Sequence, residues 1–169
     1  MSVLALLLLS LPSAKPPVLS LVELRVRHEG AEKTVRVAYP KGWTGELEAD
    51  RRTIRLFGPE GEGEMLVAAV VHPSELSPHL QGLRERHPSS VPSPPSAIDV
   101  FGVDPKKGER ATRFQITGRE VGEMVTIERG GVIVLFATIV APNAWTEIEK
   151  QMARCYPTVD VSAARKAAP

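Results

Sequence analysis

The chain contains four histidines, and two of them lie near a glutamate in a spacing that raises the question of a metal site. His72, Glu75 and His79 fall close together in the sequence. Zinc-binding helices of the protease type carry histidines at positions i and i+4 with a glutamate between them, and this spacing is absent here. We therefore expect surface or helix-end histidines, with no metal or other cofactor. An enclosed polar pocket containing these three residues would instead favour an enzyme.

The single cysteine, Cys155, lies beside Met152 and Tyr156 on the apolar side of a predicted helix. A nucleophilic thiolate needs a nearby cation or a helix N-terminus. Cys155 is near a helix C-terminus, which disfavours a negative charge. No serine has the G-x-S-x-G spacing of a nucleophile elbow. The sequence therefore predicts a noncatalytic protein in which Cys155 is a buried apolar residue.

Acidic residues form two further features that invite a functional interpretation. Residues 58–64 combine glycines and glutamates without a basic residue, whereas a phosphate-binding loop usually adds a lysine to its free backbone N–H groups. We expect a flexible acidic hairpin loop there, with weak Ca²⁺ binding as the alternative. Glu123 shares a predicted strand face with Val121 and Val125, so its carboxylate is expected to face inward. That position indicates either a partner site or a hydrated edge strand.

An aromatic turn is the strongest candidate for a binding site. Tyr39 and Trp43 flank the turn Pro40-Lys41-Gly42 directly after a predicted strand. The two rings could form an aromatic ledge that binds a partner. Alternatively, the turn folds Trp43 back over the end of the sheet, and the ring belongs to the core. We take Tyr39 and Trp43 as the candidate partner-binding residues.

Apolar and polar residues alternate through most of the chain, which is typical of strands. Residues 22–28 and 34–39 predict a hairpin around Glu29-Gly30, and Leu47 with residues 53–57 predicts a second one. Residues 65–71 are apolar at every position, which predicts a central strand covered on both faces. Four later strands are expected, and the Gly130-Gly131 pair predicts a tight turn between the last two; their ranges are 98–103, 111–117, 121–128 and 132–140.

Two helices are predicted to cover the sheet. Ser77-Pro78 supplies an N-cap signal, and apolar residues then recur at helical spacing as far as His87. A second apolar stripe runs through residues 143–156, where Trp145 and Ile148 begin the pattern. Residues 88–97 contain four prolines and predict an extended surface loop. The fold class is therefore α+β, with an antiparallel sheet flanked by two main helices.

Length and charge limit the number of domains and the kind of partner. A chain of 169 residues with 43% apolar residues can build one sizeable core, so we expect a single domain over residues 15–162 and a disordered tail over 163–169. The 21 basic and 20 acidic residues give a net charge of +1, which supplies no global attraction to nucleic acid. Arg51-Arg52 and Lys106-Lys107 are isolated pairs rather than a basic stripe. Nucleic acid is therefore excluded as an expected partner.

The order of the predicted elements resembles the PsbP/DcrB-like superfamily over about residues 33–161. The likeness rests on the strand ending in the Tyr39 to Trp43 turn, a glycine-rich hairpin, the fully apolar strand and the helix after it, and then on residues 118–161, with Trp145 in a terminal helix. The long proline-rich insert and the segment CYPTVDV depart from the family pattern. The resemblance implies an antiparallel sheet flanked by helices and a noncatalytic binding or accessory role, often outside the cytoplasm. It supplies no catalytic residues.

The N-terminal sequence predicts export. Residues 3–11 form an apolar run of the length of a secretory h-region, too short to span a bilayer, and Ser13-Ala14 follows it. Residues 1–14 are therefore expected to be a signal peptide, leaving a mature chain without an integral membrane span. The alternatives are a strand or helix of the domain, or a start codon placed too early.

Together these features predict a periplasmic or secreted, noncatalytic binding or accessory module that recognises a protein or another envelope component. The alternative is a cytoplasmic chaperone or adaptor of the same fold that holds an apolar client segment. An enzyme is the third possibility, and the oligomeric state is left open.

If residues 1–14 are a leader, the exported protein begins at Lys15. Cell fractionation with N-terminal sequencing and intact-mass measurement tests this cleavage. Leu7→Arg interrupts the apolar run and should retain residues 1–14, whereas the matched variant Leu7→Ile should be processed. An intact Met1 on cytoplasmic wild-type protein would contradict export and favour the chaperone alternative.

Overall fold

The computed structural model describes residues 19–163 of the chain. Its strands, in chain order, are β1 (Leu19–His28), β2 (Ala31–Pro40), β3 (Thr44–Leu47), β4 (Thr53–Phe57), β5 (Gly63–Val70), β6 (Ser90–Pro92), β7 (Ser96–Ala97), β8 (Arg110–Gly118), β9 (Val121–Arg129), β10 (Val132–Val140) and β11 (Asp160–Ala163). The two α-helices are α1 (Leu76–Arg86) and α2 (Trp145–Cys155). The predicted α+β class, with antiparallel strands flanked by two helices, is confirmed.

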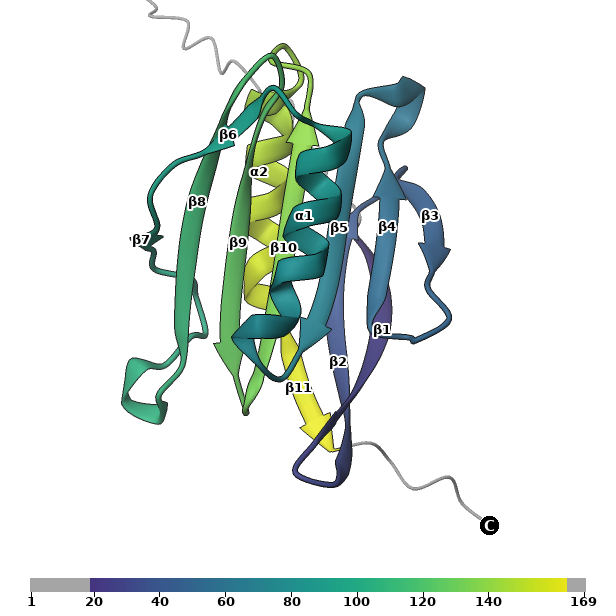
Figure 1. Ribbon diagram of the computed structural model, residues 1–169. Helices are drawn as coiled ribbons and strands as arrows, with labels where there is room; N and C mark the ends of the chain where they lie inside the picture. The colour runs from purple at the N-terminus through teal and green to yellow at the C-terminus, as the bar shows by residue number, and fades with distance from the viewer. Residues whose placement is uncertain (1–18, 164–169) are drawn as a thin grey trace, which may run out of the picture.

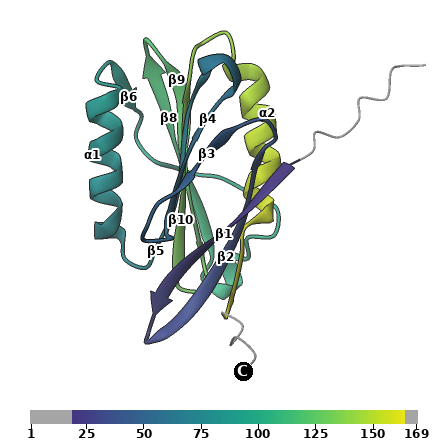
Figure 2. The ribbon, with the colours of Figure 1, turned by 90° about the vertical axis from the view of Figure 1, so that its right-hand side faces the viewer.

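The strands form two antiparallel sheets arranged in layers with the helices. The large sheet has the order β3-β4-β5-β10-β9-β8-β6, with β7 also paired to β8, and a small sheet has the order β1-β2-β11 (Figure 1). Helix α1 lies on one face of the large sheet, while α2 and the hairpin of β1 and β2 lie on the other (Figure 2). The sequence predicted one sheet; the first hairpin instead builds a separate layer.

Strand β5 explains why both faces must be covered. Met65 and Val67 point into the larger core, which α2 and the small sheet complete, whereas Leu66 and Ala68 point into the smaller core beneath α1. Because successive strand residues point to opposite faces, a strand that is apolar throughout cannot leave either face in water. The prediction of a central strand covered on both faces is confirmed.

The predicted hairpin turns are confirmed by their backbone conformations. Gly130 and Gly131 have φ values of 56° and 75° between β9 and β10, which suits the two-residue turn that their sequence predicted. Glu29 and Gly30 have φ values of 51° and 78° and join β1 to β2 in the same way. Glycine tolerates this left-handed conformation because it has no Cβ atom.

Helix α1 begins earlier than the sequence predicted. Its first residue is Leu76, so Ser77 lies within the helix and is not its N-cap. The capping interactions occur one turn upstream, in a short 3₁₀ helix over Pro73–Glu75. The Glu75 carboxylate accepts a hydrogen bond of 2.9 Å from the His72 backbone N–H, and the His72 ring accepts one of 3.3 Å from Ser74 N–H. Pro78 is tolerated because first-turn N–H groups have no partner within the helix.

The predicted strand over residues 98–103 is wrong. After the short strand Ser96–Ala97, Ile98 donates one more hydrogen bond, of 3.2 Å, to the Ala111 carbonyl of β8, and the chain then turns at Gly102, which has a φ of 85°. Ile98, Val100 and Val103 still pack against the larger core. Their apolar pattern correctly indicated packing against the core, but the turn at Gly102 prevents a continuous ladder of backbone hydrogen bonds with β8.

The proline-rich segment over residues 88–97 is more ordered than the predicted surface loop. Ser90–Pro92 and Ser96–Ala97 form two short strands that pair with β8 at the edge of the large sheet. Proline is acceptable there because an outer strand does not need every N–H for pairing.

Some predictions concern residues that the structure does not describe. The predicted signal peptide, residues 1–14, and residues 164–169 of the predicted tail lie outside the described range. Ala163, which the sequence assigned to the tail, is the last residue of β11 and pairs with Lys33. Among residues 19–163, no helix is both long and apolar enough to cross a membrane.

Candidate functional site

The aromatic turn does not present both rings to solvent. Trp43 follows β2 and is only 4% exposed, with its ring packed beside Gly58 in the larger core. Tyr39 lies near the end of β2, is partly buried and packs against the same core. This burial favours the packing interpretation of Trp43. A partner-binding role for Tyr39 and Trp43 stays a prediction.

Two of the three residues considered for a metal site, His72 and Glu75, hold the start of α1. His72 and Glu75 make the capping interactions described above, and Glu75 also accepts a hydrogen bond of 2.9 Å from Arg52. His79 lies within α1, is partly buried and makes none of these capping contacts. Within residues 19–163, no group of three histidine, cysteine or acidic residues has an arrangement that could hold a metal ion.

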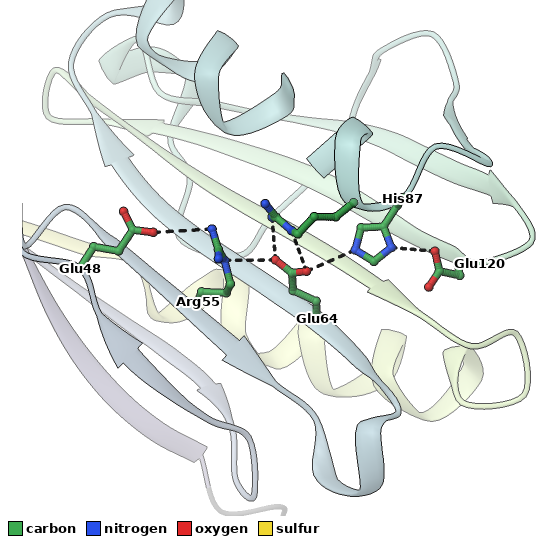
Figure 3. A network of polar contacts seen from close by, with 6 residues as sticks. Glu48, Arg55, Glu64, His87 and Glu120 are labelled. Carbon is green, nitrogen blue, oxygen red and sulfur yellow. Dashed lines mark hydrogen bonds and ion pairs between the residues drawn. The ribbon is translucent and has the colours of Figure 1, made fainter. Parts of the chain in front are cut away.

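Glu64 is the centre of a polar network that the sequence did not reveal. Its side chain is only 8% exposed and lies at the start of β5, on the face covered by α1. Arg86, at the end of α1, donates two hydrogen bonds to the carboxylate, of 3.0 and 2.7 Å. Arg55, on the neighbouring strand β4, lies 3.3 Å from one carboxylate oxygen (Figure 3). The two guanidinium groups neutralise a carboxylate that would be costly to bury alone.

His87 extends this network toward β9. Its Nε2 atom lies 3.3 Å from Glu64 and its Nδ1 atom lies 2.7 Å from Glu120, so the ring bridges two carboxylates (Figure 3). Both nitrogens can donate only when the ring carries two protons. At the other end, Glu48 lies 3.8 Å from Arg55. We call Glu48, Arg55, Glu64, Arg86, His87 and Glu120 the Glu64 network.

The Glu64 network attaches α1 to the sheet. Leu83 is the one buried residue of α1, and Leu76 and Leu80 pack beside it against the smaller core while partly exposed. The bidentate contact from Arg86 fixes the last turn of the helix over β5. The contact of His87 with the same carboxylate fixes the residue directly after the helix. The acidic loop predicted over residues 58–64 therefore ends in a structural anchor.

A second buried carboxylate lies on the opposite face of the large sheet. Glu123 is 1% exposed, accepts a hydrogen bond from the Tyr156 hydroxyl and lies 2.6 Å from the Arg113 guanidinium. Burial, with a further contribution from the Glu123 charge, raises the pKa of Tyr156 well above its usual range. The prediction that Glu123 faces inward is confirmed, but β9 lies between β8 and β10 and is not a hydrated edge strand.

Cys155, the residue before Tyr156, lies in the larger core. It is completely buried, and burial raises the pKa of its thiol to about 12. The neutral thiol is therefore the form present near neutral pH. The predicted packing position of Cys155 is confirmed.

Two hollows in the surface differ in their capacity to hold a ligand. An apolar hollow between α1 and the sheet, lined in part by Leu80, Met124 and Ile139, has a volume of only about 40 Å³. That is close to the volume of one water molecule. An open groove of about 740 Å³ follows the outer edge of β3 instead. We call it the β3 groove; its lining consists of residues 44–49 together with Arg55 and Phe57.

The β3 groove combines exposed apolar groups with acidic ones. Leu47 and Phe57 are 40% and 50% exposed, and both line the groove. Glu46 and Glu48 lie on or directly after the same strand. The groove is therefore an open surface at the sheet edge on which apolar and charged side chains lie side by side. No motif in residues 44–49 marks this groove in the sequence, because it forms only where β3 pairs with β4 at the edge of the large sheet.

The comparisons with known proteins identify the fold. No protein-family model matches the sequence, and no curated protein matches it. The solution structure of cyanobacterial PsbP (CyanoP) from Synechocystis sp. PCC 6803 is similar, with a TM-score of 0.53 and 10% identity over 93% of this chain and 99% of that chain. A Pseudomonas aeruginosa protein of unknown function matches with a TM-score of 0.41 and 13% identity, over 86% and 99% of the two chains. The predicted PsbP/DcrB-like resemblance is thus confirmed for the fold.

Replacing Trp43 separates packing from binding. We expect Trp43→Ala to lower the free energy of unfolding by about 3–5 kcal/mol, because it leaves a large cavity in the core. Urea denaturation measures this loss. The control Leu21→Ala removes a side chain that is 73% exposed and should change stability by about 0.5 kcal/mol or less. A Trp43→Ala protein that unfolds like the wild type would restore the surface-ledge interpretation.

Replacing Glu64 tests the anchor at α1. Glu64→Gln keeps the shape of the side chain but leaves the two arginines facing a neutral amide, so we expect a loss of about 1–3 kcal/mol. The matched variant Glu120→Gln alters a carboxylate that is 38% exposed, and its cost should be below about 1 kcal/mol. Chemical denaturation compares the two variants. Equal small losses would show that the Glu64 network does not hold the helix.

Proposed function

We propose that this chain is a noncatalytic binding or accessory module of the cell envelope that is exported and recognises a protein or another envelope component. The fold that it shares with cyanobacterial PsbP supports the accessory role, because the resemblance to that superfamily implies one. The apolar run over residues 3–11 supports export.

The use of the buried polar groups carries this proposal. Glu64 and Glu123 are the two buried carboxylates within residues 19–163, and each is bound by side chains that connect the sheet to a helix or its end. Cys155 is buried and protonated near neutral pH. The groups best suited to acid-base or nucleophilic chemistry are thus engaged in holding the fold, which leaves surface recognition as the function that the geometry supports best.

The β3 groove is the surface that we assign to recognition. It is larger than the hollow beside α1, which has no room for an apolar client segment. Phe57 supplies a half-exposed aromatic ring to its lining, and aromatic side chains contribute strongly at protein interfaces. A chaperone that holds an apolar client segment would need a continuous apolar surface. Among the described residues, the large apolar side chains that are exposed lie on different elements: Leu21, Leu47, Phe57, Val91 and Phe101.

Capture from an envelope extract, with two matched variants, tests the proposal. Phe57→Ser alters the β3 groove, whereas Phe101→Ser removes a ring that is 88% exposed in the loop after β7. We expect the immobilised wild type to enrich a specific envelope component, Phe57→Ser to reduce its capture at least fivefold, and Phe101→Ser to leave it unchanged. Thermal unfolding confirms that both variants are folded.

Two results would contradict the proposal. Loss of capture with Phe101→Ser alone would place the recognition surface in the loop after β7. A protein that remains in the cytoplasm with its N-terminus intact would overturn the envelope assignment.

A further inference from the structure

The two edges of the large sheet are protected to different degrees. At one edge, β6 and β7 cover part of β8, and prolines lie in and between these short strands. At the other edge, β3 is the outermost strand, and all four of its residues are exposed (Figure 1). Residues 44–47 contain no proline or lysine, the residues that commonly protect an edge from a further strand. Within residues 19–163, the edge at β3 is therefore open.

The register of β3 identifies the backbone groups that face outward. The Glu48 N–H donates a hydrogen bond of 2.8 Å to the Thr53 carbonyl, at the position after the Leu47–Ile54 pair. Hydrogen-bonded and non-hydrogen-bonded pairs alternate along an antiparallel ladder. Glu46 and Thr44 therefore turn their backbone groups toward β4, while Gly45 and Leu47 turn theirs away from it. Each of these two residues offers one N–H and one C=O to a further strand.

The side chains beside these groups favour a basic partner. Glu46 is exposed and belongs to none of the ion pairs formed within residues 19–163. Glu48, two residues later, has a side chain that is 44% exposed. Opposite charges facing each other across two strands stabilise the pairing. A strand that places lysine or arginine opposite Glu46 would therefore pair best.

The same carboxylates disfavour a second copy of this chain. The antiparallel register that uses both outward-facing residues pairs Gly45 of one copy with Leu47 of the other. It then places Glu46 directly opposite Glu46 of the second copy. Like charges in directly opposed positions destabilise strand pairing. The edge is therefore better suited to a different, basic chain than to self-association.

We propose that β3 accepts an extended basic segment of a partner protein as an additional strand of the large sheet. Gly45 and Leu47 make the backbone hydrogen bonds, and Glu46 selects lysine or arginine. This inference rests on the proposed binding function and specifies the chemistry of the partner.

Binding of defined peptides to the purified protein tests the proposal. The probe is an end-capped eight-residue peptide that alternates lysine and threonine, and the matched control alternates glutamate and threonine. Fluorescence anisotropy measures affinity, and amide chemical shifts locate the site. We expect the lysine peptide to bind at least tenfold more tightly, to shift Gly45 and Leu47, and to weaken as salt screens the charges. Methylation of its pairing N–H groups should reduce the affinity at least fivefold.

Two variants separate charge from strand pairing. Glu46→Lys alters an exposed side chain and should reverse the preference between the two peptides. Leu47→Pro removes an outward N–H that the ladder with β4 does not use, and should weaken binding at least fivefold. Leu47→Ala retains this N–H and should have a smaller effect. Thermal unfolding verifies each fold, and Glu46→Lys keeps the test decisive if Leu47→Pro does not fold.

Several outcomes would overturn strand addition at β3. They are equal binding of the methylated peptide, an unchanged preference in Glu46→Lys, and amide shifts confined to other elements. A wild-type dimer in sedimentation that Leu47→Pro dissociates would assign the edge to a second copy. If the immobilised Glu46→Lys variant captures an envelope partner as well as the immobilised wild type does, the binding function stands and only the strand mechanism fails.

Discussion

Strands β5 and β10 place apolar side chains on both of their faces, and the rest of the structure depends on covering them. Every residue of β10 is buried, and β5 is buried from its second residue onward. The cover is unequal: α1 protects one face, whereas α2 and the small sheet together protect the other (Figure 2). Because both faces of the sheet centre are occupied, exposed surface for recognition is left at the sheet edges and in the loops.

One buried carboxylate lies on each face of the large sheet and connects it to the cover on that side. Glu64 binds Arg86 at the end of α1, and Glu123 binds Tyr156 directly after α2. Arg113 adds a contact from Glu123 to Glu149 within α2. The edge-on contact between Tyr156 and Phe136, at 5.2 Å and 72°, further fixes the end of α2 against β10. Burial of an acid requires such partners, and these contacts set the positions of the two helices on the sheet.

The open edge at β3 lies beside the Glu64 network. Arg55 contacts both Glu64 and Glu48, so it joins the anchor of α1 to the lining of the β3 groove (Figure 3). This arrangement joins the lining of the β3 groove to the anchored part of the sheet. In the proposed binding mode, recognition and stability would use neighbouring residues with different roles: Arg55 and its carboxylate partners fix the lining, and Glu46, which forms no ion pair within residues 19–163, would face the incoming chain.

The sequence by itself determined the elements that depend on local order. Alternation of apolar residues located the hairpins, the all-apolar run located β5, and the stripe through Ile148 located α2, because these patterns follow from the backbone geometry of each element. It also placed Cys155 in the core and Glu123 on an inward face. It did not show that Glu64 meets Arg86, that Trp43 is enclosed, or that β3 is the open edge. Only the tertiary structure decided these points, because they depend on which distant segments become neighbours once both faces of the sheet are covered.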